Sequence, residues 1–311
     1  MKNSPSWQNL RKETHKDIMN TDILCEIVFP KEQAVLAKVC LEQAFALMRD
    51  FERRYSRFKE GNDLWQLNQS EHMELSEEFF DLLTKAKYFY EKTNGIFDPS
   101  ILSALEREGY VSNLSEHPAS QKRNFRELML NPLTRSAHKP KDLRIDLGGI
   151  GKGYIVDQVA AFLSQHFENF LIDAGGDIAV RGGNQKEGSA FWGIEVEHPR
   201  DTTASLALLL LTDQAIATSG RNRRHWEKNG ESKHHLIDPT TGKSALSDFL
   251  SVTAIAPDAT TADIFAKTLF IAGRKQAPLL AEQFHIPAIF VADDGTVTLN
   301  HFAEPYVWKA H

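Results

Sequence analysis

The segment DLGGIGKGYIVD, residues 146–157, places four glycines within six residues and then continues into an apolar, helix-like run. A glycine loop that enters a helix presents successive backbone N–H groups to an anion, and Lys152 adds a full positive charge. A tight strand-to-helix turn that needs small residues fits the same segment. The segment alone therefore leaves a phosphate-binding loop and a structural turn open.

The two common nucleotide-binding motifs do not fit this segment. A P-loop requires glycine where the chain has Asp146 and serine or threonine where it has Gly153. A dinucleotide fingerprint ends in glycine or alanine, but Tyr154 or Val156 stands at that position. The sequence therefore predicts neither a P-loop nor a dinucleotide-binding βαβ unit.

The composition is that of an ordinary globular chain, with 311 residues, 41% of them hydrophobic and 25% charged. A net charge of −6 without a basic stripe argues against a dedicated nucleic-acid binder. Cys25 and Cys40 are the only cysteines, too few for a zinc site or a disulfide framework. No run is apolar enough for a signal peptide or stable membrane insertion, so we expect a cytoplasmic protein.

The order of the expected elements indicates the fold class. Residues 1–18 read as a polar tail, and residues 19–311 as one domain. Expected helices and strands do not alternate regularly, which favours an α+β fold with mixed or antiparallel sheets and packed helices. The clearest elements are a strand at 23–29, helices at 34–58, 77–90, 154–167 and 261–272 with a cap at Thr260 or Thr261, and a hairpin at 288–299.

Two later segments carry further candidate site residues. Residues 217–245 contain Thr218-Ser219-Gly220, a basic run and the pair His234-His235, without a third ligand spaced for zinc. Residues 251–274 read as a strand that feeds a helix with Asp263 in its first turn. A carboxylate there suits the helix dipole, and it also suits a hard cation such as Mg²⁺.

Taken in order, seven segments resemble the ApbE-type FAD:protein FMN transferases. They are Met19-Asn20-Thr21, YSRFKEGNDLWQLN, NGIFDPS, DLGGIGKGYIVD, LIDAGGDIAVRG, ATSG…HHLIDPTTG and SVTAIAPDATTAD, and they span about Met19 to Gly273. The resemblance implies that FAD supplies the phosphates. It implies transfer of FMN from FAD to a Thr or Ser hydroxyl of a target flavoprotein, with release of AMP and a need for Mg²⁺.

The resemblance also implies roles for individual residues. The Gly149 carbonyl and the Asp263 carboxylate would bind Mg²⁺, and His235 would take the proton of the attacking hydroxyl. Thr218 and Ser219 would line the pocket. The residues expected to lie against FAD are Met19, Phe58, Ile96, Phe97, Asp98, Asp146, Lys152, Thr260 and Ile264.

Lys267 departs from the family pattern, which has a threonine ligand four residues after the metal aspartate. Residues four apart share a helix face, so Lys267 and Asp263 can form a simple ion pair. Alternatively, the ammonium binds phosphate and takes part of the metal's role, or the site is degenerate and slow. Lys267 thus motivates one rival function, an FAD-binding protein without turnover. A second rival is a Mg²⁺-dependent FAD pyrophosphatase, in which water replaces the acceptor hydroxyl.

Overall fold

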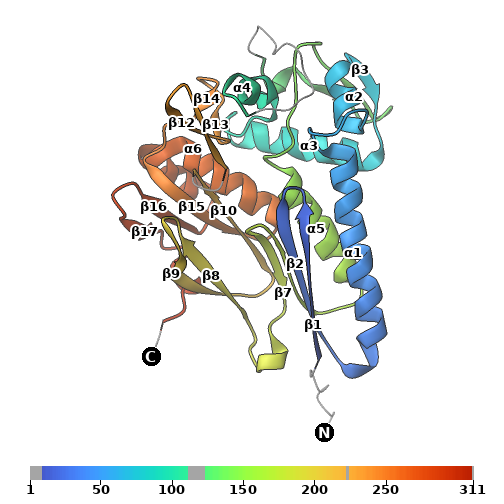
Figure 1. The fold of residues 1–311 in the computed structure, drawn as a ribbon, viewed down its shortest axis with the longest axis vertical. Coiled ribbons are helices and arrows are strands. Elements are labelled where there is room, and N and C mark those ends of the chain that lie inside the picture. Colours follow the sequence, from blue (N-terminus) through green and yellow to red (C-terminus); the bar gives the residue numbers. More distant parts are fainter. Residues whose placement is uncertain (1–8, 111–122, 222–223, 310–311) are drawn as a thin grey trace.

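The computed structural model describes residues 9–110, 123–221 and 224–309. They form an α+β fold around an eight-stranded sheet (Figure 1) in which each pair of neighbouring strands is antiparallel. This confirms the expected fold class. In sheet order the strands are β1 (Asn9–Ile18), β2 (Thr21–Phe29), β6 (Asn169–Ala174), β7 (Asp177–Arg181), β10 (Gln214–Gly220), β15 (Phe249–Ala256), β16 (Ala288–Ala292) and β17 (Val297–Leu299).

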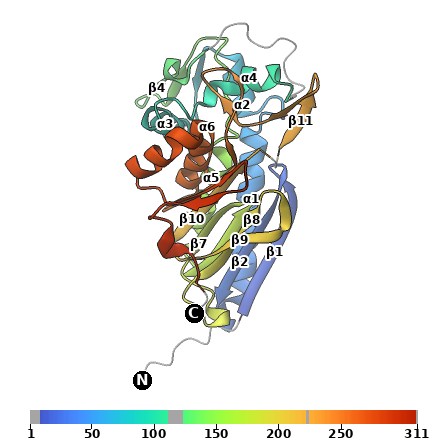
Figure 2. The same cartoon turned by 90° about the vertical axis from the view of Figure 1, so that its left-hand side faces the viewer.

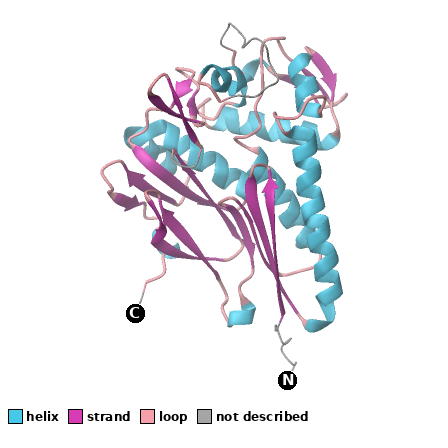
Figure 3. Ribbon diagram, in the orientation of Figure 1, coloured by secondary structure: helices cyan, strands magenta, loops and turns pink. Residues whose placement is uncertain are grey.

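Three long helices cover one face of the sheet (Figures 1 and 3): α1 (Ala34–Tyr55), α5 (Gly151–Leu163) and α6 (Ala259–Gln283). Their apolar stripes pack on the sheet and on one another, and Phe45, Phe265 and Phe270 are fully buried there. Every residue of β15 is buried because this strand lies inside the sheet between covered faces.

The opposite face is covered by a hairpin of β8 (Trp192–His198) and β9 (Asp201–Leu211). The side chains of β8 alternate between buried and exposed, as a strand with one covered face requires. Trp192, Ile194 and Val196 pack against Val180 and Ile216 of the sheet. The sheet is therefore the middle layer between helices and a hairpin.

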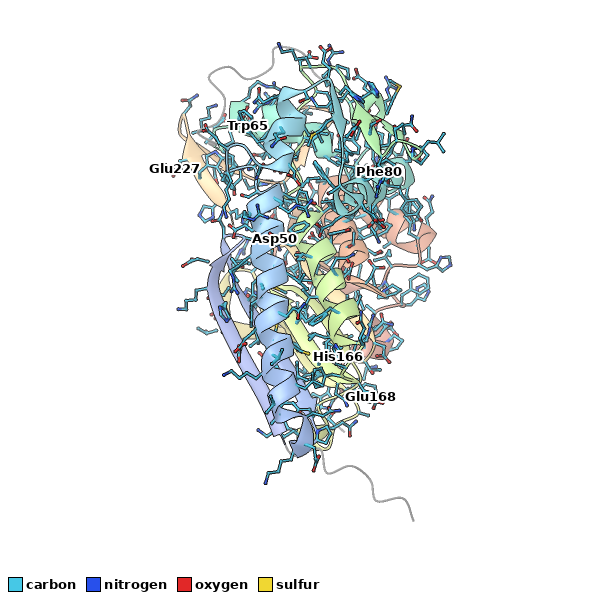
Figure 4. The ribbon with its side chains drawn as sticks, turned by 90° about the vertical axis from the view of Figure 1, so that its right-hand side faces the viewer. Asp50, Trp65, Phe80, His166, Glu168 and Glu227 are labelled. Carbon is cyan, nitrogen blue, oxygen red and sulfur yellow. The ribbon has the colours of Figure 1, made fainter. Side chains whose placement is uncertain are left out.

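Smaller elements gather at one end of the molecule (Figure 2). In Figure 4, which looks onto α1, Trp65 and Phe80 mark this end, Asp50 lies in the last third of α1, and His166 and Glu168 lie toward the other end. The elements at this end are α2 (Asp63–Gln69), α3 (Glu77–Lys92), α4 (Leu102–Arg107), β3 (His72–Glu74), β4 (Met129–Asn131), β5 (Ser136–His138), β11 (His225–Lys228), β12 (Glu231–His234), β13 (Ile237–Asp238) and β14 (Lys243–Ser244), with the 3₁₀ turns η2 (Pro99–Ile101) and η3 (Phe125–Glu127). The other 3₁₀ turns of the described residues are η1 (Lys31–Gln33), η4 (Gln185–Glu187) and η5 (Glu304–Tyr306), which lie elsewhere (Figure 1).

The expected N-terminal tail is wrong for residues 9–18, because these residues form the edge strand β1; residues 1–8 lie outside the described part. The polar pattern that suggested a tail is typical of an edge strand, where charged side chains discourage pairing with other chains. Met19 and Asn20, both with φ of 56°, make the two-residue turn into β2. The domain boundary expected at residue 19 would therefore divide the β1–β2 hairpin.

Helix α6 begins earlier than expected. Its N-cap is Asp258, which accepts hydrogen bonds from the backbone N–H and the hydroxyl of Thr261, so the expected cap at Thr260 or Thr261 is wrong. Gly273 interrupts the helix with φ of 69°, just after the expected end at residue 272. The other expected helices and the hairpin at 288–299 match α1, α3, α5 and β16–β17 to within a few residues.

The starts of α5 and α6 lie in direct contact. A Cβ on Gly153 would stand 2.6 Å from the carbonyl oxygen of Ala259, so only glycine allows this approach. Asp157, one turn further along α5, accepts hydrogen bonds from the backbone N–H groups of Ala259 and Thr260. Part of the glycine loop is thus explained by helix packing.

We expect Gly153→Ala to lower the free energy of unfolding by about 1–3 kcal/mol, because the added methyl group must push the two helices apart. Urea denaturation measures this change. Gly193→Ala is the matched control: its methyl group would meet only a Leu208 side-chain atom at 3.4 Å, and we expect almost no loss. Equal losses in the two variants would contradict a close-packing role for Gly153.

Candidate functional site

Two pockets meet at the N-terminal end of α5. The apolar pocket has a volume of 140 Å³ and the polar pocket 540 Å³. Their shared walls come from the β1–β2 turn, the glycine loop, α6 and the segment before β13, and consist of Asn20, Gly148, Lys152, Arg224, His235 and Lys267. A ligand with an apolar ring system, a charged middle and a polar end can therefore run from one pocket into the other.

The apolar pocket collects most of the residues expected to contact FAD. Its walls come from the end of α1, the segment 96–101, the glycine loop and residues 235–239. Asp98 is 7% exposed and accepts hydrogen bonds from the backbone N–H and the hydroxyl of Ser100, so it also caps a turn. The expected residues that line this pocket are Met19, Phe58, Ile96, Phe97, Asp98, Asp146, Gly149 and Lys152.

The polar pocket lies over the outer face of the sheet beneath β8. Thr218 and Ser219 of β10 line it, as expected, and the Thr218 hydroxyl is 2.9 Å from the Thr253 hydroxyl. Six consecutive residues, 194–199, line its other side. Because neighbouring residues of a strand point to opposite faces, this continuous run indicates that the pocket follows the edge of β8.

Four alternating charges, here called the charged cluster, stand where the pockets meet: Lys152, Asp177, Asp263 and Lys267. The Nζ atom of Lys152 is 2.6 Å from Oδ2 of Asp177 and 3.5 Å from the carbonyl oxygen of Ala174. The ammonium of Lys267 donates to Oδ1 of Asp263. The Asp263–Lys267 pair expected from the four-residue spacing is therefore present.

Asp263 is deeply buried, with 2% of its surface exposed, rather than surface-facing as a first-turn position suggests. Burial and the nearby Asp177 raise the pKa of its carboxyl group, and Lys267 and Lys152 oppose that rise. Within the described residues its Oδ2 atom has no hydrogen-bond partner. An unpartnered buried carboxylate oxygen suits a cation, although those residues contain no group of three His, Cys, Asp or Glu side chains arranged for a metal.

His235 lines both pockets and is partly exposed. Its Nδ1 atom is 3.3 Å from the carbonyl oxygen of Arg224, so Nδ1–H donates and Nε2 keeps a free lone pair. Burial, with help from Arg224 and Lys267, lowers the pKa of His235 to about 3. The imidazole is therefore neutral at pH 7 and has an acceptor atom available.

Thr260 and Ile264 line neither pocket. Both belong to the core, with 1% and 0% of their surface exposed, and the Thr260 hydroxyl donates to Asp157. Their side chains are therefore separated from the other expected FAD contacts. The structure gives them a role in seating α6 on α5.

Sequence reasoning missed three charged residues of the site: Arg57, Asp177 and Arg224. Asp177 follows two glycines in the segment LIDAGGD, and a carboxylate beside such a turn was a usable signal. Arg57 precedes Phe58, which was identified, and Arg224 belongs to a run read only as basic. Their positions depend on long-range pairing, which local patterns do not report.

The fold of this chain is similar to the folds of solved ApbE proteins. The ApbE protein of Thermotoga maritima has 25% identity and a TM-score of 0.87, over 97% of this chain and 100% of that one. The flavin transferase ApbE of Vibrio cholerae has 25% identity and a TM-score of 0.82, over 96% of this chain and 99% of that one.

The sequence comparisons lead to the same family. The FAD:protein FMN transferase of Treponema pallidum is 29% identical over 301 residues, covering 88% of this chain and 83% of that protein. The FAD:protein FMN transferase of Vibrio cholerae is 30% identical over 265 residues, covering 80% and 78%. The ApbE family model matches residues 19–290. The chain belongs to the ApbE family, which confirms the resemblance.

We expect Lys267→Met to destabilise the protein, measured in EDTA, by about 3 kcal/mol at pH 8, because it leaves the buried Asp263 carboxylate without its partner. The loss should shrink towards pH 5. A buried carboxyl with a raised pKa holds a proton in the folded protein that the unfolded chain has released, so stability falls as pH rises through that raised pKa.

Urea denaturation at both pH values measures this dependence. Lys275→Met is the control, since Lys275 is exposed on the same helix and should change little at either pH. A loss for Lys267→Met that is equal at pH 5 and pH 8 would mean that packing of the lysine stem, rather than the charge pair, accounts for the effect.

Proposed function

We propose that the protein is an FAD:protein FMN transferase, which moves FMN from FAD to a threonine or serine hydroxyl of a target flavoprotein and releases AMP. The observation that carries the proposal is the charged cluster at the junction of an apolar and a polar pocket. FAD has ring systems at both ends and a pyrophosphate between them, and the junction offers two ammonium groups for that pyrophosphate.

The chain's own residues supply positioning and charge. Lys152 and Lys267 face the developing negative charge on the phosphate oxygens, in a site whose buried surroundings strengthen electrostatic interactions. Asp177 and Asp263 hold the two ammonium groups in place. The polar pocket, with a volume of 540 Å³, lies beside them and would take the acceptor hydroxyl.

Mg²⁺ fits the same cluster. Asp263 would hold it through the Oδ2 atom that has no partner among the described residues, and Gly149 through its backbone carbonyl. When bound, Mg²⁺ would neutralise charge on the pyrophosphate. Lys267, on the other carboxylate oxygen, competes for Asp263 and so weakens rather than replaces the metal.

In this proposal, His235 takes the proton of the acceptor hydroxyl, which its position in both pockets supports. Its Nδ1–H is engaged by Arg224, which fixes the tautomer and leaves Nε2 as the proton acceptor. A low pKa makes the neutral form available but weakens the base. Pyrophosphate bound nearby would raise that pKa, so substrate binding itself would improve the base.

The direct test is incubation with FAD and Mg²⁺, with AMP measured by chromatography, in the presence and absence of a flavoprotein that offers an acceptor threonine or serine. We expect Asp263→Asn to reduce AMP release by about 100-fold or more, because the substitution keeps the shape but removes the charge. Asp248→Asn, on an exposed aspartate, is the control and should retain full activity.

The same incubation separates the rival functions. AMP release with covalent flavin on the target indicates transfer, and AMP release without it indicates a pyrophosphatase. FAD bound with no AMP released indicates a binding protein. Either of the last two results would overturn the proposal.

Lys267→Thr should lower the Mg²⁺ concentration needed for half-maximal AMP release several-fold, because the ammonium no longer competes for Asp263 and a hydroxyl becomes available. Titration of Mg²⁺ against AMP release measures this shift. Full turnover of the unmodified protein in excess EDTA would instead mean that the ammonium serves in place of the metal.

A further inference from the structure

Arg57 is the most unusual buried cation of the described residues. It lies just after α1, lines the apolar pocket and has 7% of its surface exposed. Both terminal nitrogens, Nη1 and Nη2, are shielded from solvent and have no hydrogen-bond partner among the described residues. Guanidinium groups have five N–H donors and remain charged, so two empty nitrogens in a buried site are costly.

The surroundings hold this guanidinium without satisfying it. Its central carbon lies 4.2 Å from the ring centre of Tyr110 and 4.6 Å from that of Phe58. Its Nε atom is 3.7 Å from Oδ1 of Asp146, an ion-pair distance that is too long for a hydrogen bond. Tyr110 is itself held by stacking on Trp226, with the ring centres 4.9 Å apart.

A purely structural role does not explain this arrangement. A structural buried arginine has its fork engaged by carboxylates or carbonyls, as Arg54 has with Asp63, Glu78 and Ser76 one helical turn earlier. Arg57 has aromatic faces beside it but no acceptor for its fork. The missing acceptor is one that a ligand in the apolar pocket can supply.

We propose that Arg57 is a ligand-binding residue, whose fork donates in its own plane to the acceptor edge of a heteroaromatic ring of FAD bound in the apolar pocket. Because Nη1 and Nη2 are shielded in the free protein, the proposal requires the Phe58 side chain, which is 41% exposed, to turn aside on binding. The proposal rests on the proposed function only in taking FAD as the ligand. Asp146 is then a positioning residue for Arg57.

Both ends of FAD can supply this chemistry. The isoalloxazine ring carries adjacent acceptors, a ring nitrogen beside a carbonyl oxygen, which match the two parallel donors of an arginine fork. Adenine carries single ring nitrogens as acceptors, which engage one donor each. Binding of FMN and of AMP, measured separately, therefore identifies the ring that Arg57 contacts.

The test is the dissociation constant of FAD, FMN and AMP for the full chain in EDTA, measured by equilibrium dialysis for the unmodified protein and for Arg57→Met. We expect FAD affinity to fall about 10- to 100-fold, the value of a hydrogen bond to a charged group. Of the two fragments, FMN and AMP, only the one whose ring contacts Arg57 should lose affinity by the same factor as FAD. The thermal unfolding midpoint should change little, because removing an unsatisfied buried charge offsets the loss of the ion pair with Asp146.

Arg54→Met is the matched control, with the opposite expected pattern: a lower unfolding midpoint and unchanged FAD affinity. Arg57→Lys keeps the charge but lacks the fork, so it should also bind FAD at least tenfold less tightly. This variant tests the proposal if Arg57→Met does not fold. FAD affinity within twofold of the unmodified protein, in Arg57→Met or in Arg57→Lys, overturns the proposal, as does a result in which neither fragment is affected.

These measurements do not depend on turnover. A protein that binds FAD through Arg57 but transfers no FMN would sink the proposed function and leave this inference standing. If the Arg57→Met variant transfers FMN and its FAD affinity is unchanged, this inference fails and the proposed function stands.

Discussion

The close contact between the starts of α5 and α6 determines where everything else in the site stands. Gly153 lets the two helices approach to a distance that any side chain would prevent, and Asp157 locks the first turn of α6 to α5. Lys152 and Asp263 lie within a few residues of that contact, on different helices. The glycine loop therefore serves packing first, and the charges of the site follow from the packing.

The charged cluster contains two ammonium groups and two carboxylates, so its charges balance. The Lys152–Asp177 pair joins α5 to β7, and the Asp263–Lys267 pair joins successive turns of α6. Balance makes the buried charges tolerable in the free protein. Under the proposed function, an arriving pyrophosphate would compete with Asp177 and Asp263 for the same ammonium groups. Binding and catalysis then share one set of partners, and a cation on Asp263 would release Lys267 towards the substrate.

The sequence predicted the fold class and the main helices, because hydrophobic periodicity is a local signal. The pocket residues that it anticipated came from the family resemblance, and of these only Thr260 and Ile264 line neither pocket. It failed at β1, whose polar edge pattern resembles a tail, and the position of Asp263 in its helix did not reveal that this residue is buried. It also missed Arg57 and Asp177, which matter through partners distant in the chain. Thr260 and Ile264 were expected beside the ligand, yet their side chains serve the core.

The β1–β2 hairpin has a consequence for how the protein can be attached to other structures. Its turn, Met19–Asn20, lines the pockets, while β1 runs away from them for ten residues, a length of about 30 Å. A membrane anchor, a tether or a fused domain joined ahead of Asn9 would start that far from the site and leave it open to a bulky acceptor protein. Removing residues 1–18 would instead leave β2 without its neighbouring strand β1 and leave the Met19–Asn20 turn held from one side only.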